Sequence, residues 1–223
     1  KLAQWAASTD KLPALRFGEK AAAVLDQVFT KFPEESSLHR DLFGGNFFTS
    51  MIGLSGAVYW SCLVSVSGSP VGALLLADGR SWSVFEAAWT AHKTADASLL
   101  PLVLSFMINC VDRCEDSVVE QARFLKIDNI MLLPDIASAF EADGLDASVQ
   151  TLLALLLTCL CRQDRTNMAV MEGAWKQASL AKLSDLVDSF VRGKQGRRGS
   201  PEETEVLALL AEASTCYRRL RAN

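Results

Sequence analysis

The feature of this sequence that most constrains its fold is a pair of residues, one small and polar and the next a cysteine, which occurs four times. The four pairs are Ser61-Cys62, Asn109-Cys110, Thr158-Cys159 and Thr215-Cys216. The cysteines of successive pairs are 48, 49 and 57 residues apart, and the longest interval contains a Gly- and Arg-rich insert over 193–200. A period of about 20–50 residues is typical of repeat folds, in which each unit buries its apolar face against its neighbours.

The apolar residues around these pairs follow the spacing of a helix and not that of a strand. Three apolar stripes have this helical spacing: Leu152, Leu153, Leu156, Leu157 and Leu160; Leu180, Leu183, Val187 and Phe190; and Trp82, Phe85 and Trp89. Helix starts are marked by Asp146 and Ser148, and by Ser200-Pro201 followed by two glutamates. Strand-like alternation is nearly absent, so the sequence predicts an all-α fold.

The order of segments within each period resembles an armadillo repeat. That family combines a helix ending in small residues, a loop with Asn, a short helix, a Gly turn and a long third helix. The best-matching stretch contains Leu153, Leu156, Leu157, Thr158-Cys159, Asn167, Glu172-Gly173-Ala174, Leu180, Leu183 and Val187. The preceding period has Asp128-Asn129 where the Gly would stand, and Asn tolerates the same left-handed turn.

The resemblance covers residues 14–223 and implies a right-handed α-solenoid of about four to five armadillo-like helical repeats in a single domain over 1–223. The expected units are 14–53, 54–95, 98–143, 146–192 and an incomplete 202–223. We expect a helix over 202–221 to pack on the fourth unit and to leave an apolar edge. This edge and the start at Lys1 predict a chain that is part of a larger chain or complex.

The amino-acid composition and charge of the chain argue against several classes of protein. Hydrophobic residues make up 50% of the 223 residues, which excludes a disordered chain. The net charge of −4 argues against binding to nucleic acid. Residues 42–77 carry no charge, but glycines and Pro70 interrupt the stretch, so we interpret it as buried helices and not as a membrane span.

The six cysteines predict a reducing compartment and a cytoplasmic location, because a chain of this size can build a core without disulfides. We interpret the cysteines of the repeated pairs as small core residues. A metal site is the alternative, because Cys110 and Cys114 are four residues apart and Cys161 follows Cys159 closely. With only two histidines in the chain, we expect neither metal nor cofactor.

Motifs that carry catalysis are absent from the sequence. It contains no P-loop, no dinucleotide fingerprint, no zinc-protease helix and no nucleophile elbow. A nucleophilic pair of Cys62 and His92 is conceivable but has no other support. Trp82 and Trp89 share a stripe with Phe85, which favours a place in the core over a binding surface.

The resemblance also implies where a partner would bind, because the third helix of each armadillo unit lines a concave groove. Polar positions between the stripe residues are therefore candidate partner-binding residues: Ser83, Glu86, Thr90, Asp135, Ser138, Lys182 and Asp185. The regular Trp and Asn ladder of nuclear-signal receptors is not repeated here, which disfavours that function.

Charge is distributed unevenly along the chain. Residues 1–191 have a net charge of −7 and residues 192–223 a net charge of +3. Arg197 and Arg198 in the insert could dock an acidic partner surface. They also precede Ser200 in a pattern that resembles a basophilic kinase site, although a solvated loop is the simpler interpretation.

Together these observations predict a non-catalytic scaffold or adaptor that binds one or more proteins through the concave or end surface of a solenoid. The alternative is a regulatory or docking segment of a larger multidomain enzyme or assembly. A thiol- or metal-dependent enzyme is a third, weaker hypothesis.

Overall fold

The computed structural model describes part of the chain, and most of the described residues are helical, as the sequence predicts. Side chains are described for most of them. By contacts, the chain divides into two compact units, Lys1–Glu115 and Asp116–Asn223. The described residues are 23–24, 27, 31, 47–54, 56–68, 81–113, 126–127, 130–161, 165–174, 177–194, 211, 214–215 and 218.

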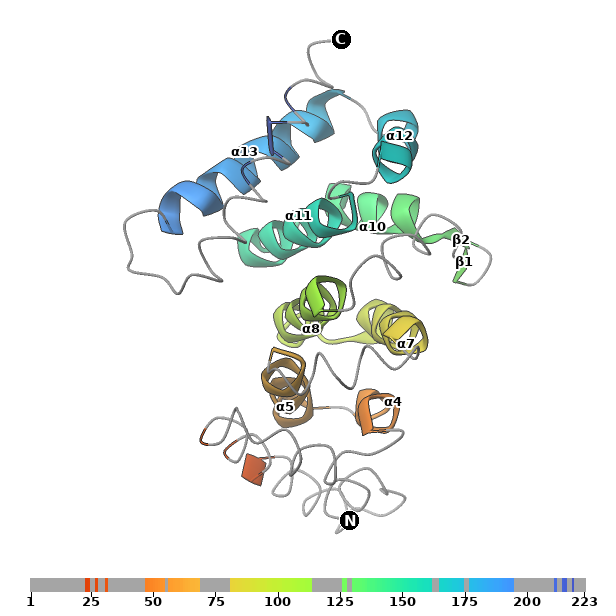
Figure 1. Cartoon of the computed structure of the whole chain (residues 1–223), viewed down its shortest axis with the longest axis vertical. Coiled ribbons are helices and arrows are strands. Elements are labelled where there is room, and N and C mark those ends of the chain that lie inside the picture. The colour runs from red at the N-terminus through yellow and green to blue at the C-terminus, as the bar shows by residue number, and fades with distance from the viewer. Residues whose placement is uncertain are drawn as a thin grey trace. The chain divides into compact units, whose positions relative to one another are not determined.

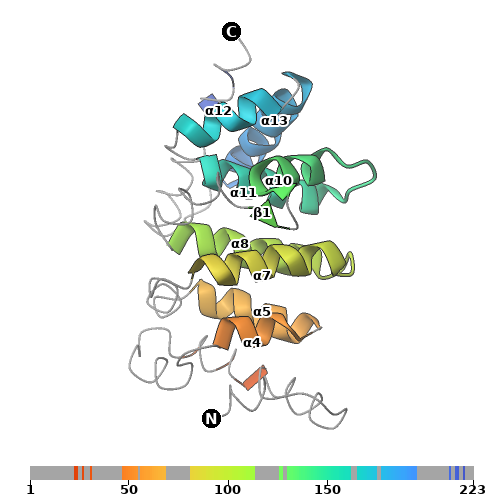
Figure 2. The same cartoon turned by 90° about the vertical axis from the view of Figure 1, so that its right-hand side faces the viewer.

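The first unit contains two layers of paired helices. Helices α4 (Phe47–Ile52) and α5 (Ala57–Ser67) form one layer, and α7 (Ser81–Thr94) and α8 (Leu100–Arg113) form the next (Figures 1 and 2). Between the layers, α5 packs on α8 and α4 packs on α7. Each pair thus buries the face that it could not bury alone.

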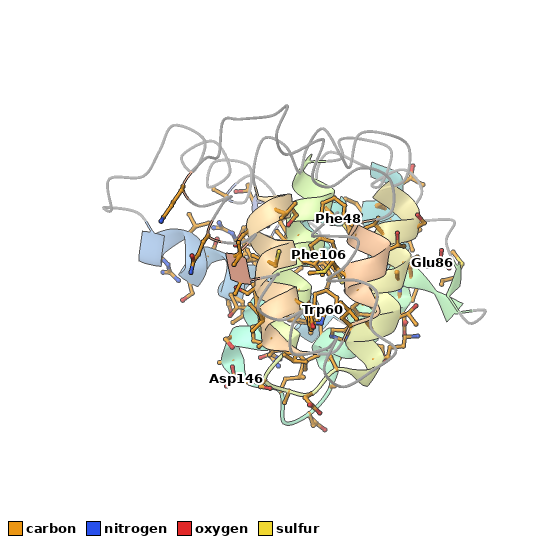
Figure 3. All side chains as sticks on the ribbon, turned by 90° about the horizontal axis from the view of Figure 1, so that it is seen from below. Phe48, Trp60, Glu86, Phe106 and Asp146 are labelled. Carbon is orange, nitrogen blue, oxygen red and sulfur yellow. The ribbon has the colours of Figure 1, made fainter. Side chains whose placement is uncertain are left out.

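An aromatic cluster fills the space between these layers. The ring centroid of Phe106 on α8 lies 5.8 Å from that of Phe48 on α4 and 6.0 Å from that of Trp60 on α5. Figure 3 shows the three side chains converging in the interior of the unit. The first pair is tilted and the second is edge-on, the latter an arrangement that aromatic pairs prefer, and all three residues are buried.

The helices of the first unit form because their apolar residues recur with helical spacing. Helix α8 buries side chains one, three and four residues apart, namely Val103, Leu104, Phe106, Met107, Cys110 and Val111. Pro101 stands in its first turn, where no intrahelical N–H bond is lost. Trp60 of α5 and Trp89 of α7 are both buried. Trp89 is the tryptophan of the predicted stripe whose side chain the structure describes, and its burial confirms that it belongs to the core.

Four helices of the second unit lie in the part of the chain that the structure describes. These are α10 (Leu132–Glu141), α11 (Ala147–Cys161), α12 (Arg165–Ala174) and α13 (Gln177–Lys194). Helix α11 contacts each of the other three, and every residue from Leu153 to Cys161 is buried for that reason. Gly144, in the turn before α11, has a φ of 77°, which is a conformation that glycine adopts without strain.

One element was not expected from the sequence. Strands β1 (Lys126–Ile127) and β2 (Ile130–Met131) pair antiparallel, with Ile127 opposite Ile130. The paired residues flank Asp128 and Asn129, which lie outside the described residues. Two paired strands of two residues each therefore flank the place where the sequence predicts a turn.

Parts of the repeat pattern have structural counterparts. Cys62, Cys110 and Cys159 are buried in α5, α8 and α11 respectively. The division between the two units falls inside the stretch 98–143 that was expected to form one repeat. The armadillo repeats and their boundaries stay a prediction. None of the described helices has the length and apolar character needed to cross a membrane.

Candidate interaction surfaces

Helix α7 has a polar face opposite its buried one. Ser83, Glu86 and Thr90 are three and four residues apart, so they share one side of the helix. Ser83 and Thr90 are exposed and Glu86 is half-buried, whereas Phe85 and Trp89 are buried. Figure 3 shows Glu86 at the outside of the unit, away from the aromatic cluster. These three predicted residues therefore form one surface, which we call the α7 face.

The remaining described candidates lie on two helices of the second unit. Asp135 is half-buried and Ser138 is exposed on α10, and Lys182 and Asp185 are exposed on α13. The ammonium of Lys182 lies 5.7 Å from the centroid of the buried Phe140 ring on α10, a cation–π arrangement. Lys182 of α13 thus contacts a residue of α10, which sequence reasoning did not foresee.

Several candidates fall outside the described residues. These are Arg197, Arg198 and the possible phosphosite Ser200, together with Cys114 and Cys216. The side chain of Trp82 is likewise not described.

A polar cluster on the second unit joins residues that the sequence analysis did not identify as candidates. The Ser214 hydroxyl donates to Asp188 Oδ1 and lies 3.2 Å from the Ser184 hydroxyl. Arg218 Nη2 lies 3.3 Å from the same carboxylate oxygen and forms an ion pair with it. We call these four residues the polar seam. In the sequence these residues form two pairs with a spacing of four residues, 184 with 188 and 214 with 218. Nothing in the sequence shows that the two pairs contact each other.

The cysteines of the described part are buried thiols. Cys62 and Cys110 lie in the first unit and Cys159 and Cys161 in the second. Burial in apolar surroundings makes a thiol unreactive and suits the predicted core role. Among the residues that the structure describes, no three His, Cys, Asp or Glu side chains lie close enough to hold a metal ion. His92 instead stacks on Trp89 of the same helix, with ring centroids 4.4 Å apart.

Two asparagine side chains donate hydrogen bonds to backbone carbonyls near the end of a neighbouring helix. Asn167 is buried, and its Nδ2 donates to the Leu160 carbonyl near the end of α11 at 2.8 Å. Asn109 on α8 donates to the Val64 carbonyl of α5 at 3.2 Å and to Ser67 Oγ at 3.1 Å. The last four carbonyls of a helix have no partner within it, and the Asn167 amide satisfies one of them. The Val64 carbonyl also accepts from the Gly68 N–H and from Ser67 Oγ, so Asn109 adds a bond between helices to a carbonyl that already has partners.

The start of α11 has the cap that the sequence predicts. Asp146 Oδ1 accepts a hydrogen bond from the Ser148 backbone N–H at 2.8 Å and another from the Ser148 hydroxyl. These bonds to the Ser148 side chain and backbone hold the pKa of Asp146 below its ordinary value. The carboxylate also lies at the positive end of the helix dipole.

Comparison of the chain with protein-family models, with curated proteins and with solved structures finds no match in any of the three. The case for a function therefore rests on the geometry described above.

Proposed function

We propose that this protein is a non-catalytic scaffold of the armadillo-like helical-repeat type, which binds one or more other proteins in the cytoplasm. The observation that carries the proposal is the α7 face. It is a polar strip on a helix whose opposite side is anchored in a two-layer helical stack. Stacked helix pairs present the outer faces of successive helices as extended surfaces, and such surfaces suit protein binding.

The rigidity of α7 supports this assignment. Val84, Phe85, Ala88 and Trp89 are each at most 4% exposed, so the backbone that carries Ser83, Glu86 and Thr90 is held by the core. The Thr90 hydroxyl donates to the Glu86 carbonyl at 2.9 Å, which ties this exposed side chain to the helix backbone. A preorganised surface loses little conformational entropy when a partner binds.

The binding role can be tested with two variants that change charge equally. The first, Glu86→Arg with Thr90→Arg, places two bulky cations on the α7 face. The second, Asp96→Arg with Ala97→Arg, makes the same charge change at exposed positions of the same unit, after the end of α7. Both variants should keep the thermal unfolding midpoint close to that of the unmodified protein, because Thr90, Asp96 and Ala97 are exposed and Glu86 is only half-buried.

We expect quantitative affinity purification from cells to recover at least one protein with the unmodified chain and with the Asp96/Ala97 variant. The same protein should be lost with the Glu86/Thr90 variant. Equal recovery with all three chains would show that the α7 face is not the binding surface.

A further inference from the structure

The connection between α10 and α11 is a short exposed turn. From the last residue of α10 to the second residue of α11, every residue over 141–148 is exposed except Leu145, which is half-buried. Figure 2 shows the connection as a loop that projects beyond the ends of both helices. Exposed loops are more mobile than the elements that they join. This turn contains Asp143 followed by Gly144, and the pair can undergo a reaction of its own.

The backbone of the turn requires glycine at position 144. The φ of Gly144 is 77°, in the left-handed region that residues with a side chain rarely adopt. Apart from the two chain neighbours, no atom of the described residues lies within 4 Å of a Cβ built at this position. The Gly144 nitrogen therefore has no Cβ beside it, and the described residues leave the position open.

The Asp143 carboxylate and the Gly144 N–H are both available for reaction. Neither makes a hydrogen bond or an ion pair with a residue in the described part of the chain. The next aspartate, Asp146, differs, because its carboxylate accepts hydrogen bonds from the backbone and the side chain of Ser148. These bonds hold the pKa of Asp146 below its ordinary value, so its carboxyl group is protonated less often.

The residue that follows each aspartate also distinguishes Asp143. Among the described residues, it is the only aspartate followed by glycine. Asp96 is also exposed, but it precedes Ala97, whose methyl group hinders the approach of the backbone nitrogen to the carboxyl group. A second such pair, Asp78-Gly79, lies outside the described residues.

We propose that Asp143 is a site of spontaneous isoaspartate formation, in which the backbone nitrogen of Gly144 is the nucleophile. The nitrogen attacks Cγ of the protonated Asp143 side chain, so that an N–Cγ bond forms and the Cγ–OH bond breaks. The hydroxyl group leaves with the amide proton as one molecule of water, and a cyclic succinimide remains.

Water then opens the ring at one of its two carbonyl carbons. Attack at Cγ breaks the new N–Cγ bond and restores aspartate. Attack at the main-chain carbonyl carbon of Asp143 breaks its bond to the Gly144 nitrogen, and the chain then continues through Cγ. One water is released and one is consumed, so the net reaction is an isomerisation that requires no other reactant.

The isoaspartyl product has one additional atom in its backbone and a carboxylate attached directly to Cα. The change lies three residues before Asp146, which caps α11, so it lengthens the connection that positions the start of this helix. The site belongs to the second unit, and its reaction does not depend on the binding role proposed for the α7 face.

Incubation of the native full chain in water enriched in heavy oxygen tests the proposal. Each passage through the ring introduces one solvent oxygen into residue 143, whereas a carboxylate that does not cyclise keeps its own oxygens at neutral pH. After weeks at neutral pH, we expect both heavy oxygen and isoaspartate at Asp143 and neither at Asp96. Peptide mass spectrometry with electron-transfer fragmentation locates the label and distinguishes the two linkages.

Asp143→Glu is the matched variant, because it keeps the charge at an exposed position and its side chain would have to close a larger, less favourable ring. We expect this variant to lose both signals and to keep the thermal midpoint of the unmodified chain. The unmodified chain in urea is the positive control for the chemistry. Label that enters residue 143 only in urea would mean that the folded turn prevents ring closure, and it would overturn the proposal. Equal labelling of Asp143 and Asp96 in the native chain would overturn it too.

Discussion

At the scale of single residues, Asn167 offers the sharpest test of the second unit. Asn167→Ala removes the donor that lies 2.8 Å from the Leu160 carbonyl, in a place where the Asn side chain is fully buried. A buried carbonyl that loses its partner costs about 1–3 kcal/mol. We expect the free energy of unfolding, measured by urea titration with circular dichroism, to fall by about that amount.

The control for Asn167 is Ser138→Ala, an exposed position on α10 of the same unit. A surface substitution of this kind changes stability by less than about 0.5 kcal/mol. An Asn167 variant as stable as the Ser138 variant would mean that the Leu160 carbonyl finds another donor.

The Asp146 cap predicts a pH dependence. Its pKa is lower in the folded chain than in the unfolded one, chiefly because the Ser148 side chain donates to the carboxylate. The unfolded chain therefore takes up this proton first as pH falls. The stabilisation is complete above the unfolded-state pKa of about 3.9 and is lost as pH drops through the folded-state pKa.

We accordingly expect Asp146→Ala to lower the thermal midpoint at pH 7 and to have a diminishing effect as pH falls below about 4. Differential scanning calorimetry between pH 7 and pH 3 provides the measurement. Asp143→Ala, an exposed change three residues earlier, should show no such convergence. A difference between Asp146→Ala and the unmodified chain that stays constant with pH would contradict the assigned cap.

At the scale of elements, the contact of α5 with α8 depends on a shared set of hydrogen bonds. The Val64 carbonyl accepts from the Gly68 N–H, from Ser67 Oγ and from Asn109 Nδ2, and the Asn109 amide also donates to Ser67 Oγ. Asn109→Ala should destabilise the chain by about 1–2 kcal/mol, since it removes the only one of these donors that comes from α8.

A double-mutant cycle with Ser67→Ala tests whether the two residues act as a unit. Because they share one bond, the loss of stability in the double variant should be smaller than the sum of the two single losses by about 0.5 kcal/mol or more. Simple additivity in urea unfolding would show that Asn109 and Ser67 contribute independently.

Elements with strong apolar periodicity were predictable from sequence, and those defined by pairing were not. The leucine stripe from Leu152 to Leu160 predicts α11, because its spacing is that of a helix in contact on several sides. The β1–β2 ladder has two residues per strand, which is too short for any periodicity to be visible. It is defined by the backbone register of two residue pairs and not by a pattern of burial.

The same reasoning applies to the candidate surfaces. The α7 face was predictable because Ser83, Glu86 and Thr90 alternate with stripe residues on one helix. The seam was not, because Asp188 receives its hydrogen bond from a residue 26 positions away and its ion pair from one 30 positions away. A sequence shows which face of a helix is polar, but not which segment covers that face.

At the scale of the whole molecule, each of the two compact units contains buried thiols whose reactivity reports on the opening of that unit. Cys62 and Cys110 are buried thiols of the first unit, and Cys159 and Cys161 are buried thiols of the second. A buried thiol reacts with an alkylating reagent only when its surroundings open. We expect all four to react slowly with N-ethylmaleimide in the native chain and rapidly in urea.

One core substitution in each unit shows how these openings are organised. Phe106→Ala empties the aromatic cluster between Phe48 and Trp60, and Leu156→Ala makes a cavity at a completely buried position of α11. Such changes cost about 3–5 and 2–5 kcal/mol respectively, and 3 kcal/mol corresponds to about a hundredfold rise in an opening constant.

If each unit opens as its own cooperative core, Phe106→Ala accelerates labelling of the first unit's two thiols. Leu156→Ala then accelerates labelling of Cys159 and Cys161, so each variant is the control for the other. Mass spectrometry of peptides after a timed pulse of reagent measures the four rates separately. Equal acceleration of all four thiols by either substitution would mean that both units open in one step. The contact-based division would then describe packing but not the unit of cooperative unfolding.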